Sequence, residues 1–245
     1  METTIIIMCG GQGKRMNSDL PKVLHKINNI PMLCMIINQA RKLKPKNIMI
    51  IVGKYKDIIK STISKYTTLS DLEFIDQLIP LGTGHAIFCC KDYLINMNSR
   101  VLILSGDVPL ITDTTMKIMV NDNNTKIIGT VINDPKGYGR IIMDDNFQCI
   151  VEDKDCDDDQ KKVNLVNCGI YAISSELICK YIGEIKNNNK QNEYYLTDLI
   201  GIIKNNGHDV LVHTISKEQQ YEITGVNDPQ QLKELEILYN KLIKI

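Results

Sequence analysis

The stretch TTIIIMCGGQGKRM, residues 3–16, joins a short apolar run to a glycine-rich loop. The β-branched run, bounded by glycines, has the pattern of a buried parallel strand. The loop matches neither the Walker A motif nor G-x-G-x-x-G, because Met8 and Met16 stand where those motifs require glycine. Its glycines still let backbone N–H groups approach an anion, and Lys14 and Arg15 follow at once. We therefore predict a phosphate-binding loop, the alternative being a surface turn with solvated basic side chains.

Strand-like and helix-like segments alternate after this loop. This alternation predicts parallel βαβ units with right-handed crossovers, so ligands should bind outside the carboxyl ends of the strands. Three glycine-bearing segments fall at that edge, after Met8, around Gly82 and at Gly106. The expected strands are residues 47–53, 72–78 and 100–107, and the expected helices are residues 32–43, 56–66, 82–94 and 112–120.

The second half of the sequence is less regular. Five apolar runs look like strands separated by polar turns, and a helix with Pro229 in its first turn follows them. We therefore expect an α/β fold, with a mostly parallel sheet, helices on both faces and a small β-rich lobe. The further strands are expected at residues 126–132, 139–144, 147–153, 163–173 and 209–215, and the last helix at residues 229–245.

Composition excludes several classes of protein. The 245 residues include 29 basic and 29 acidic side chains, without the basic surplus typical of nucleic-acid binders. No apolar stretch reaches the roughly 18 residues of a membrane-spanning helix, and the N-terminal residues lack the basic leader of a signal peptide. The eight cysteines include no C-x-x-C pair, which favours reduced, buried thiols over a zinc site. We expect a cytoplasmic protein without nucleic-acid or membrane partners.

Several polar residues beside these segments are candidates for chemistry. Lys22 follows Pro21, whose fixed φ angle could aim the lysine at a defined point, although a solvated lysine at a helix start is the alternative. Thr83 lies in a small polar turn that could approach a flat base, or that could be a plain loop-to-helix turn. Asp107 ends an expected strand, where a carboxylate can hold Mg²⁺ or simply cap a turn. We interpret His85 as a structural hydrogen-bonding group.

Nine stretches, taken in order, resemble the pyrophosphorylase (uridylyltransferase) domain of the bacterial bifunctional N-acetylglucosamine-1-phosphate uridylyltransferases. Each stretch is weakly specific alone, whereas the ordered combination is highly specific. The resemblance implies a Rossmann-like nucleotidyltransferase fold over residues 1–228 with a β-rich sugar-binding lobe, followed by a C-terminal helix over residues 229–245. The stretches, which span Met8 to Asp228, are MCGGQGKRM, SDLPKVLH, LGTGHA, GDVPLI, DPKGYGRI, VEDKD, NCGIY, NEYYLTD and GVND.

The resemblance also implies a role for each matching residue, with UTP and N-acetylglucosamine 1-phosphate as substrates and Mg²⁺ as cofactor. The catalytic residues would be Arg15, Lys22 and Asp107. The protein ligands of the metal would be Asp107 and Asn227. The sugar would contact Gly139, Glu152, Asn167 and Asn227. The nucleotide would contact Met8, Cys9, Gly10, Gly11, Gly13, Lys22, Gln77, Gly82, Thr83, Ser105, Gly106 and Asp107.

Three departures from the family pattern lie in or near this site. Ser105 replaces the usual tyrosine, Cys168 replaces the usual threonine, and the loop reads MCGG where LAAG is usual. The first two bear on sugar selectivity, and the third still supplies backbone donors. The bacterial family continues into a left-handed β-helix acetyltransferase built of hexapeptide repeats. This sequence contains no such repeats, so we expect no acetyltransferase domain.

The expected reaction transfers UMP from UTP to N-acetyl-α-D-glucosamine 1-phosphate and releases pyrophosphate. The sugar phosphate is itself an anionic nucleophile, so positioning and charge neutralisation suffice for in-line attack at the α-phosphorus. One alternative is a nucleotidyltransferase for a different sugar 1-phosphate or base. Another is a non-catalytic UDP-sugar sensor, against which the retained Arg15, Lys22, Asp107 and Asn227 argue.

Overall fold

Parallel strands form one half of the central sheet in the computed structural model, which describes residues 2–11 and 13–243. β1 lies between β4 and β6 and is parallel to both, and β5 pairs in parallel with β4. Except for Met8 at the end of β1, the apolar side chains of β1, β4 and β6 are buried, as expected for strands covered on both faces. The predicted parallel half is therefore confirmed. Its strands are β1 (Glu2–Met8), β4 (Asn47–Val52), β5 (Leu72–Asp76) and β6 (Ser99–Ser105).

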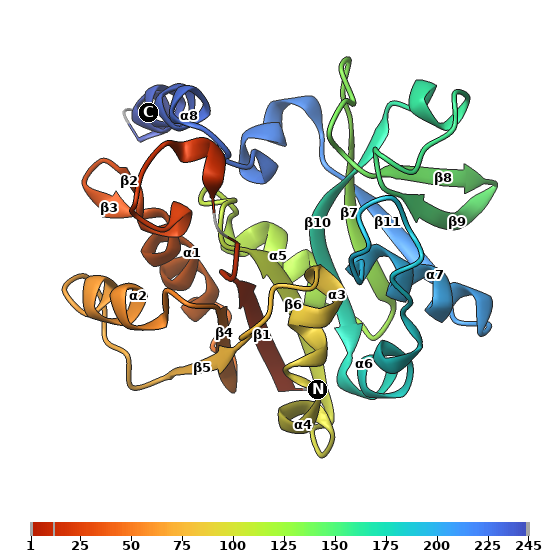
Figure 1. Ribbon diagram of the computed structural model, residues 1–245, viewed down its shortest axis with the longest axis horizontal. Helices are drawn as coiled ribbons and strands as arrows, with labels where there is room; N and C mark the ends of the chain where they lie inside the picture. Colours follow the sequence, from red (N-terminus) through yellow and green to blue (C-terminus); the bar gives the residue numbers. More distant parts are fainter. Residues whose placement is uncertain (1, 12, 244–245) are drawn as a thin grey trace.

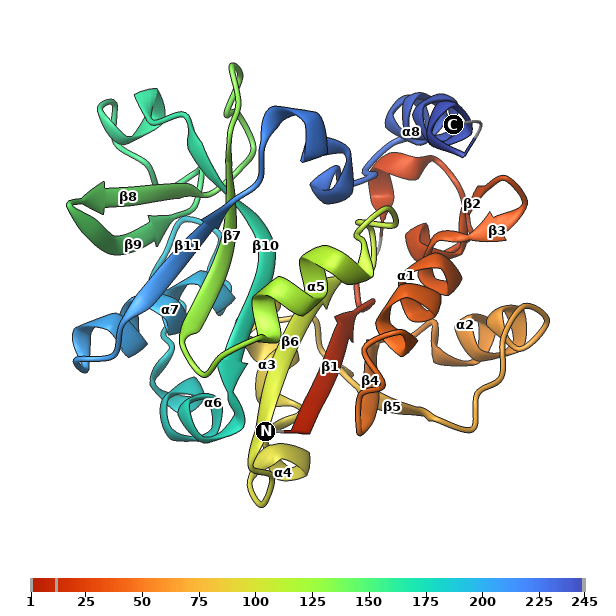
Figure 2. The same cartoon turned by 180° about the vertical axis from the view of Figure 1, so that it is seen from behind.

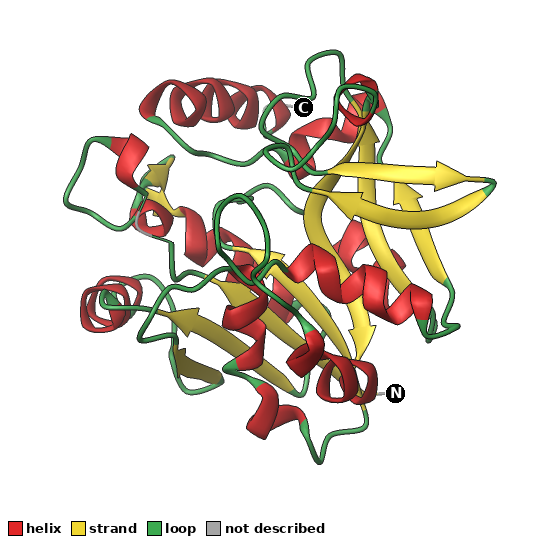
Figure 3. Ribbon diagram, turned by 45° about the vertical axis from the view of Figure 1, so that its right-hand side comes forward, coloured by secondary structure: helices red, strands yellow, loops and turns green. Residues whose placement is uncertain are grey.

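The other half of the sheet is organised by β10, which runs antiparallel to β6 and to β7. β11 extends the sheet in parallel beyond β7, giving the order β11-β7-β10-β6-β1-β4-β5. The hairpin of β8 and β9 is attached to this sheet by the pairing of β8 with β10. It forms the expected β-rich part of the molecule (Figure 3). These strands are β7 (Thr125–Val131), β8 (Arg140–Asp144), β9 (Asn146–Val151), β10 (Leu165–Ser174) and β11 (Val210–Thr214).

Helices cover both faces of the sheet, because successive side chains of each central strand point to opposite sides. In β1, Ile5 and Ile7 belong to the apolar cluster that includes residues of α1, α2 and α5, whereas Ile6 belongs to the cluster that includes residues of α3, α4, α6 and α7. The ribbon views show the helices lying on the two sides of the sheet (Figures 1 and 2). No helix in the described part of the chain has both the length and the apolar character needed to cross a bilayer. These helices are α1 (Met32–Arg41), α2 (Lys56–Ile63), α3 (Thr83–Phe88), α4 (Lys91–Leu94), α5 (Asp113–Val120), α6 (Ser175–Tyr181) and α7 (Leu196–Asn205).

The helix expected over residues 82–94 is divided into α3 and α4. The backbone N–H of Cys90 donates to the carbonyl of Ile87, three residues back, at 2.9 Å. This tighter closure ends the α-helical pattern, and α4 begins one residue later. The predicted start of a helix after Gly82 is confirmed, whereas the break between α3 and α4 was not predicted, because periodicity alone does not locate such a turn.

α8 (Pro229–Leu242) packs on a small hairpin that the sequence did not predict, β2 (Lys26–Ile27) and β3 (Ile30–Pro31). Asp228 caps α8 by accepting from the backbone N–H of Gln231 at 2.8 Å. This confirms the expected helix start, while residues 244 and 245 lie outside the described residues. A separate apolar cluster joins α8, the hairpin and the loop after β6. Short 3-10 helices complete the fold: η1 (Lys14–Met16), η2 (Lys22–Leu24), η3 (Gln160–Lys162), η4 (Ile182–Glu184) and η5 (Lys217–Ile223).

A buried carboxylate fixes the path of the chain between η5 and α8. Glu222, which is 3% exposed, accepts from the Thr112 hydroxyl at 2.6 Å and from the Thr115 hydroxyl at 2.7 Å. The backbone N–H of Thr112 also donates to the same oxygen at 3.2 Å. Thr112 is the N-cap of α5, so Glu222 ties η5 to the start of that helix. The segment that follows Glu222 is thereby held beside the carboxyl end of β6.

We predict that Glu222→Ala lowers the free energy of unfolding by about 2–3 kcal/mol, because buried donors lose their acceptor. Glu218→Ala is the matched control, since Glu218 is exposed on the same 3-10 helix. It should change stability by less than about 0.5 kcal/mol. Urea unfolding followed by circular dichroism measures both. Equal effects of the two substitutions would contradict the anchoring role of Glu222.

Candidate active site

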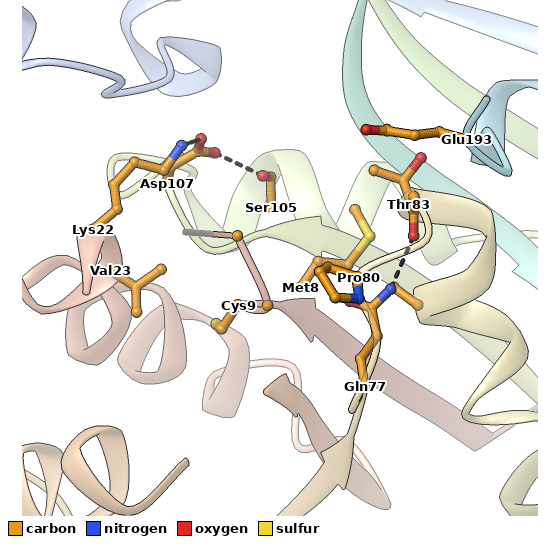
Figure 4. A pocket seen from close by; sticks show the side chains of 14 residues that line it. Met8, Cys9, Lys22, Val23, Gln77, Pro80, Thr83, Ser105, Asp107 and Glu193 are labelled. Atoms are coloured by element: carbon orange, nitrogen blue, oxygen red, sulfur yellow. Dashed lines mark hydrogen bonds and ion pairs between the residues drawn. The ribbon is translucent and has the colours of Figure 1, made fainter. Parts of the chain in front are cut away.

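Two adjoining cavities open at the edge of the sheet where β1, β5 and β6 end. The first, here called the loop cavity, measures about 280 Å³, and the second, the β10 cavity, measures about 250 Å³. Met8, Thr83, Ser105 and Asp107 line both, so the cavities meet at the end of β1 and β6. Figure 4 shows the loop cavity, with Lys22 and Asp107 on one side and Thr83 and Glu193 on the other.

The glycine-rich loop follows β1 and approaches its neighbours closely. A Cβ atom on Gly10 would lie 2.7 Å from Oε1 of Gln77, so the absence of a side chain there leaves room for the glutamine. Gly13 has a φ angle of +59°, and a Cβ atom on it would lie 2.7 Å from Cβ of Lys22. The loop therefore folds back onto the backbone that carries Lys22.

A cation and three oxygen-bearing side chains converge where the two cavities meet. Nζ of Lys22 donates to Oδ2 of Asp107 and, at 3.2 Å, to Oδ1 of Asn227. The Ser105 hydroxyl donates to the other oxygen of Asp107 at 2.6 Å (Figure 4). The backbone N–H of Val226 donates to the carbonyl of Asp107 at 2.9 Å, which brings Asn227 to this point. We call Lys22, Asp107 and Asn227 the charge triangle.

The far wall of the loop cavity is built by a backbone interlock. Gly84 N–H donates to the Tyr194 carbonyl at 2.7 Å, and Tyr194 N–H donates to the Leu81 carbonyl at 2.8 Å. Gly82 has a φ angle of +117°, and a Cβ atom there would lie 2.5 Å from the Tyr194 carbonyl oxygen. Any side chain at Gly82 would therefore push apart the turn before α3 and the chain before α7.

Polar side chains around this interlock form hydrogen bonds with other parts of the protein. Gln77 donates through Nε2 to the Gly82 carbonyl at 3.0 Å and lies 3.2 Å from Nδ1 of His85. This agrees with the interpretation of His85 as a structural group. The Thr83 hydroxyl accepts from the Leu196 backbone N–H at 3.0 Å, so it satisfies the first turn of α7.

The β10 cavity brings together three of the four residues predicted to contact the sugar, namely Gly139, Glu152 and Asn167. A Cβ atom on Gly139 would lie 3.6 Å from Oε2 of Glu152 and 3.7 Å from Cβ of Asn167. The Thr197 hydroxyl donates to Oε1 of Glu152 at 3.0 Å, and Nδ2 of Asn167 donates to the Tyr171 hydroxyl at 2.7 Å. Buried neighbours thus orient both polar side chains toward the space in front of Gly139.

Cys168 lies in an irregular part of β10, where the register to β7 shifts between Asn167 and Tyr171. Gly169 follows with a φ angle of +70°, so the strand bulges where it lines the cavity. Burial raises the pKa of the Cys168 thiol to about 12, which keeps it neutral. The residue that replaces the family's threonine is therefore a weak, uncharged hydrogen-bonding group.

The cavities bring together fourteen of the residues predicted to touch ligands and leave three outside the lining. Arg15 is exposed on η1 and lines neither cavity. Gly13 packs against Lys22, and Gly106 N–H donates to the Met8 carbonyl at 3.0 Å. These two glycines therefore help to position the backbone around the site. The lining residues are Met8, Cys9, Gly10, Gly11, Lys22, Gln77, Gly82, Thr83, Ser105, Asp107, Gly139, Glu152, Asn167 and Asn227.

Four further polar residues belong to the site and had been given no role. Glu193 lines the loop cavity, and Tyr138 and Tyr171 line the β10 cavity, while Thr197 holds Glu152. All four lie inside the stretches DPKGYGRI, NCGIY and NEYYLTD. The motifs therefore carried a signal for them, but the contacts that give them roles depend on the folded chain.

The charge triangle is the part of the site that fits a divalent cation. Asp107 and Asn227 offer a carboxylate and an amide oxygen, the hard ligands that Mg²⁺ prefers, and both already contact one cation, the ammonium of Lys22. Within residues 2–11 and 13–243, no group of three or more His, Cys, Asp or Glu side chains could hold a metal ion. The two oxygen donors would therefore need further oxygen atoms from a ligand and from water.

Two half-buried acidic side chains, Glu152 in the lining of the β10 cavity and Asp198 next to Thr197, have raised pKa values. Burial, more than any other cause, raises the pKa of Glu152. Burial and then the charge of Asp155 raise the pKa of Asp198 from 3.8 to about 6. The native state therefore holds the Asp198 proton more tightly than the unfolded chain does, and stability falls as this group ionises with rising pH.

We predict that Asp198→Asn raises the melting temperature above that of the wild type at about pH 8, because the amide cannot ionise. The difference should shrink as the pH falls below the pKa of about 6. Asp209→Asn is the control, since Asp209 is exposed just before β11. Differential scanning fluorimetry across this range measures both. An Asp198→Asn curve that stays parallel to the wild type would contradict the raised pKa.

Comparisons with known proteins identify relatives that cover nearly the whole chain. The family model for the MobA-like NTP transferase domain matches residues 5–139. The "Probable UDP-N-acetylglucosamine pyrophosphorylase" of Acanthamoeba polyphaga mimivirus is 42% identical over 240 residues, covering 95% of this chain and 94% of that protein. The "Bifunctional protein GlmU" of Clostridium beijerinckii is 39% identical over 244 residues, covering 97% of this chain but 52% of that protein. This chain thus spans about half the length of that bifunctional relative.

A solved structure supports the fold independently. UDP-glucose pyrophosphorylase complexed with UDP-glucose superposes with a TM-score of 0.76 at 16% identity, covering 98% of this chain and 99% of that chain. This likeness confirms the Rossmann-like nucleotidyltransferase fold. Together with the family match and the 42% identity to the viral relative, it leads to one assignment. The chain belongs to the nucleotidyltransferases with a MobA-like NTP transferase domain, in the group that contains the viral pyrophosphorylase and part of the bifunctional bacterial proteins.

Proposed function

We propose that the protein transfers UMP from UTP to N-acetyl-α-D-glucosamine 1-phosphate, giving UDP-N-acetylglucosamine and pyrophosphate. The observation that carries this proposal is the meeting of two cavities at the charge triangle. One cavity has a glycine-rich loop suited to phosphates, and the other has converging polar groups suited to a sugar. The named relatives support the choice of this reaction.

The loop cavity is the proposed site of UTP. Gly10, Gly11 and Lys22 line it, and we assign the phosphates to the backbone N–H groups of the two glycines and to the lysine. Gln77 and the turn at Gly82 and Thr83 read the flat base. Nε2 of Gln77 is engaged with the protein, so its Oε1 is the group available to accept from the base N–H. Arg15 is exposed on η1, from which it can reach phosphates only after a change of side-chain position.

The β10 cavity is the proposed site of the sugar phosphate. Glu152 and Asn167 offer acceptor and donor groups to the hydroxyls and the N-acetyl group, and Gly139 leaves room between them. Thr197 and Tyr171 hold these two side chains in place before the substrate arrives. Such preorganisation reduces the entropy lost on binding and favours one orientation of the sugar.

The chemistry needs no general base from the protein. An oxygen atom of the sugar phosphate, already anionic, forms a bond to the α-phosphorus of UTP. The bond between the α-phosphorus and the bridging oxygen breaks, and pyrophosphate leaves with the electron pair. Lys22 meets the negative charge that develops on the transferring group and on the leaving group. The protein therefore contributes alignment and positive charge.

Asp107 and Asn227 are the proposed protein ligands of Mg²⁺. When bound, the ion would neutralise negative charge on the reacting phosphates, and its two positive charges would do so more strongly than one lysine side chain. Cytoplasmic location is also proposed, and the eight free cysteines are consistent with a reducing compartment.

Pyrophosphate release over a panel of substrates tests the function. The panel pairs UTP, dTTP and CTP with N-acetylglucosamine 1-phosphate and glucose 1-phosphate. We expect the highest kcat/KM with UTP and N-acetylglucosamine 1-phosphate. A higher kcat/KM with another pair would replace the substrate assignment. Tight UDP-sugar binding without any turnover would show a sensor instead.

We predict that Asp107→Asn lowers kcat by roughly 10²-fold or more, the scale of losing a preorganised electrostatic group. Asn227→Ala should lower kcat less, because water can replace a neutral ligand. Steady-state kinetics over a range of Mg²⁺ concentrations measures both variants. Near-normal activity of Asp107→Asn with an unchanged Mg²⁺ dependence would show that Asp107 only caps its turn.

A further inference from the structure

Lys22 occupies the position between the two oxygen donors that the proposed function assigns to Mg²⁺. Its ammonium contacts Oδ2 of Asp107 and lies 3.2 Å from Oδ1 of Asn227. We infer that Lys22 is a tethered cation that excludes divalent metal from the free protein and yields the position when nucleotide phosphates bind. This inference rests on the proposed metal site and adds to it an order of loading.

The two cations cannot share the position. Mg²⁺ binds oxygen ligands at about 2.0–2.1 Å, so an ion held by both Asp107 and Asn227 must lie between them. The ammonium already fills that space, and a second positive charge beside it would be repelled strongly in a partly desolvated site. The Lys22 and Asp107 side chains are only 16% and 17% exposed, so water screens this repulsion weakly.

The nucleotide offers Lys22 an alternative partner. The loop cavity is lined by Lys22 together with Gly10 and Gly11, so phosphates in it come within reach of the flexible lysine side chain. A triphosphate carries more negative charge than one carboxylate and attracts the ammonium more strongly. Moving Lys22 onto the phosphates leaves the oxygen atoms of Asp107 and Asn227 free for the metal.

The same contact organises the site before any ligand binds. Lys22 joins the chain after the glycine-rich loop to the end of β6 and to the segment before α8, which are 85 and 205 residues away in sequence from it. It thus keeps the two future ligands at one point and neutralises Asp107. Because binding free energies are coupled reciprocally, metal should also tighten nucleotide binding.

Binding of Mn²⁺ as a probe tests this inference without measuring activity. Electron paramagnetic resonance of free Mn²⁺ gives the Kd for the full chain, without nucleotide and with a non-hydrolysable UTP analogue. We expect weak binding to the wild type without nucleotide, and Lys22→Met should tighten that binding by about 5-fold or more, within the usual range of coupling between sites. Lys22→Arg, which keeps the charge, should bind as weakly as the wild type.

Lys26→Met is the matched control, because Lys26 is exposed on β2 and stacks on Tyr66 rather than touching Asp107. It removes the same charge and should leave the Kd for Mn²⁺ unchanged. If Lys22→Met and Lys26→Met have equal effects, the tethered-cation inference is overturned while the metal site stands. If Asp107→Asn leaves Mn²⁺ binding with the nucleotide analogue unchanged, the proposed metal site itself is overturned.

Discussion

The contact of the Lys22 ammonium with Asp107 and Asn227 is the interaction on which the rest of the site depends. It joins three segments that the fold delivers separately, namely the chain after the glycine-rich loop, the end of β6 and the segment between η5 and α8. Parallel pairing of β1 and β6 brings the first two to one edge of the sheet. Glu222 and the Val226–Asp107 backbone contact bring the third. A partly desolvated charge is costly unless it is paired, so these constraints support one another.

The change of strand direction at β10 gives the site its second cavity. An all-parallel sheet would place the start of β10 at the opposite edge, far from Asp107. Because β10 runs antiparallel to β6, its first residues, including Asn167, lie beyond the carboxyl end of β6. The β8–β9 hairpin then places Gly139 and Glu152 beside them. The mixed topology therefore lets one edge of the sheet hold two ligands that must react with each other.

Much of this arrangement could be predicted from sequence, for reasons that differ between residues. The apolar runs predicted β1, β4 and β6, because strands buried on both faces leave an unbroken pattern. The motif order singled out fourteen residues that line the cavities, whereas Gly13, Arg15 and Gly106 lie outside the lining. The β2–β3 hairpin was not predicted, because each strand has two residues and no recognisable alternation. The direction of the Lys22 side chain was also beyond prediction, since it depends on the partners that the folded chain provides.

The most direct test of the account is the position of the two cations when nucleotide is bound. A crystal structure with Mn²⁺ and a non-hydrolysable UTP analogue, recorded with anomalous scattering, would locate the metal and Lys22 together. We expect an anomalous peak between the Asp107 and Asn227 oxygen atoms, with the Lys22 ammonium on the nucleotide phosphates. A peak elsewhere, with Lys22 still bridging Asp107 and Asn227, would contradict it.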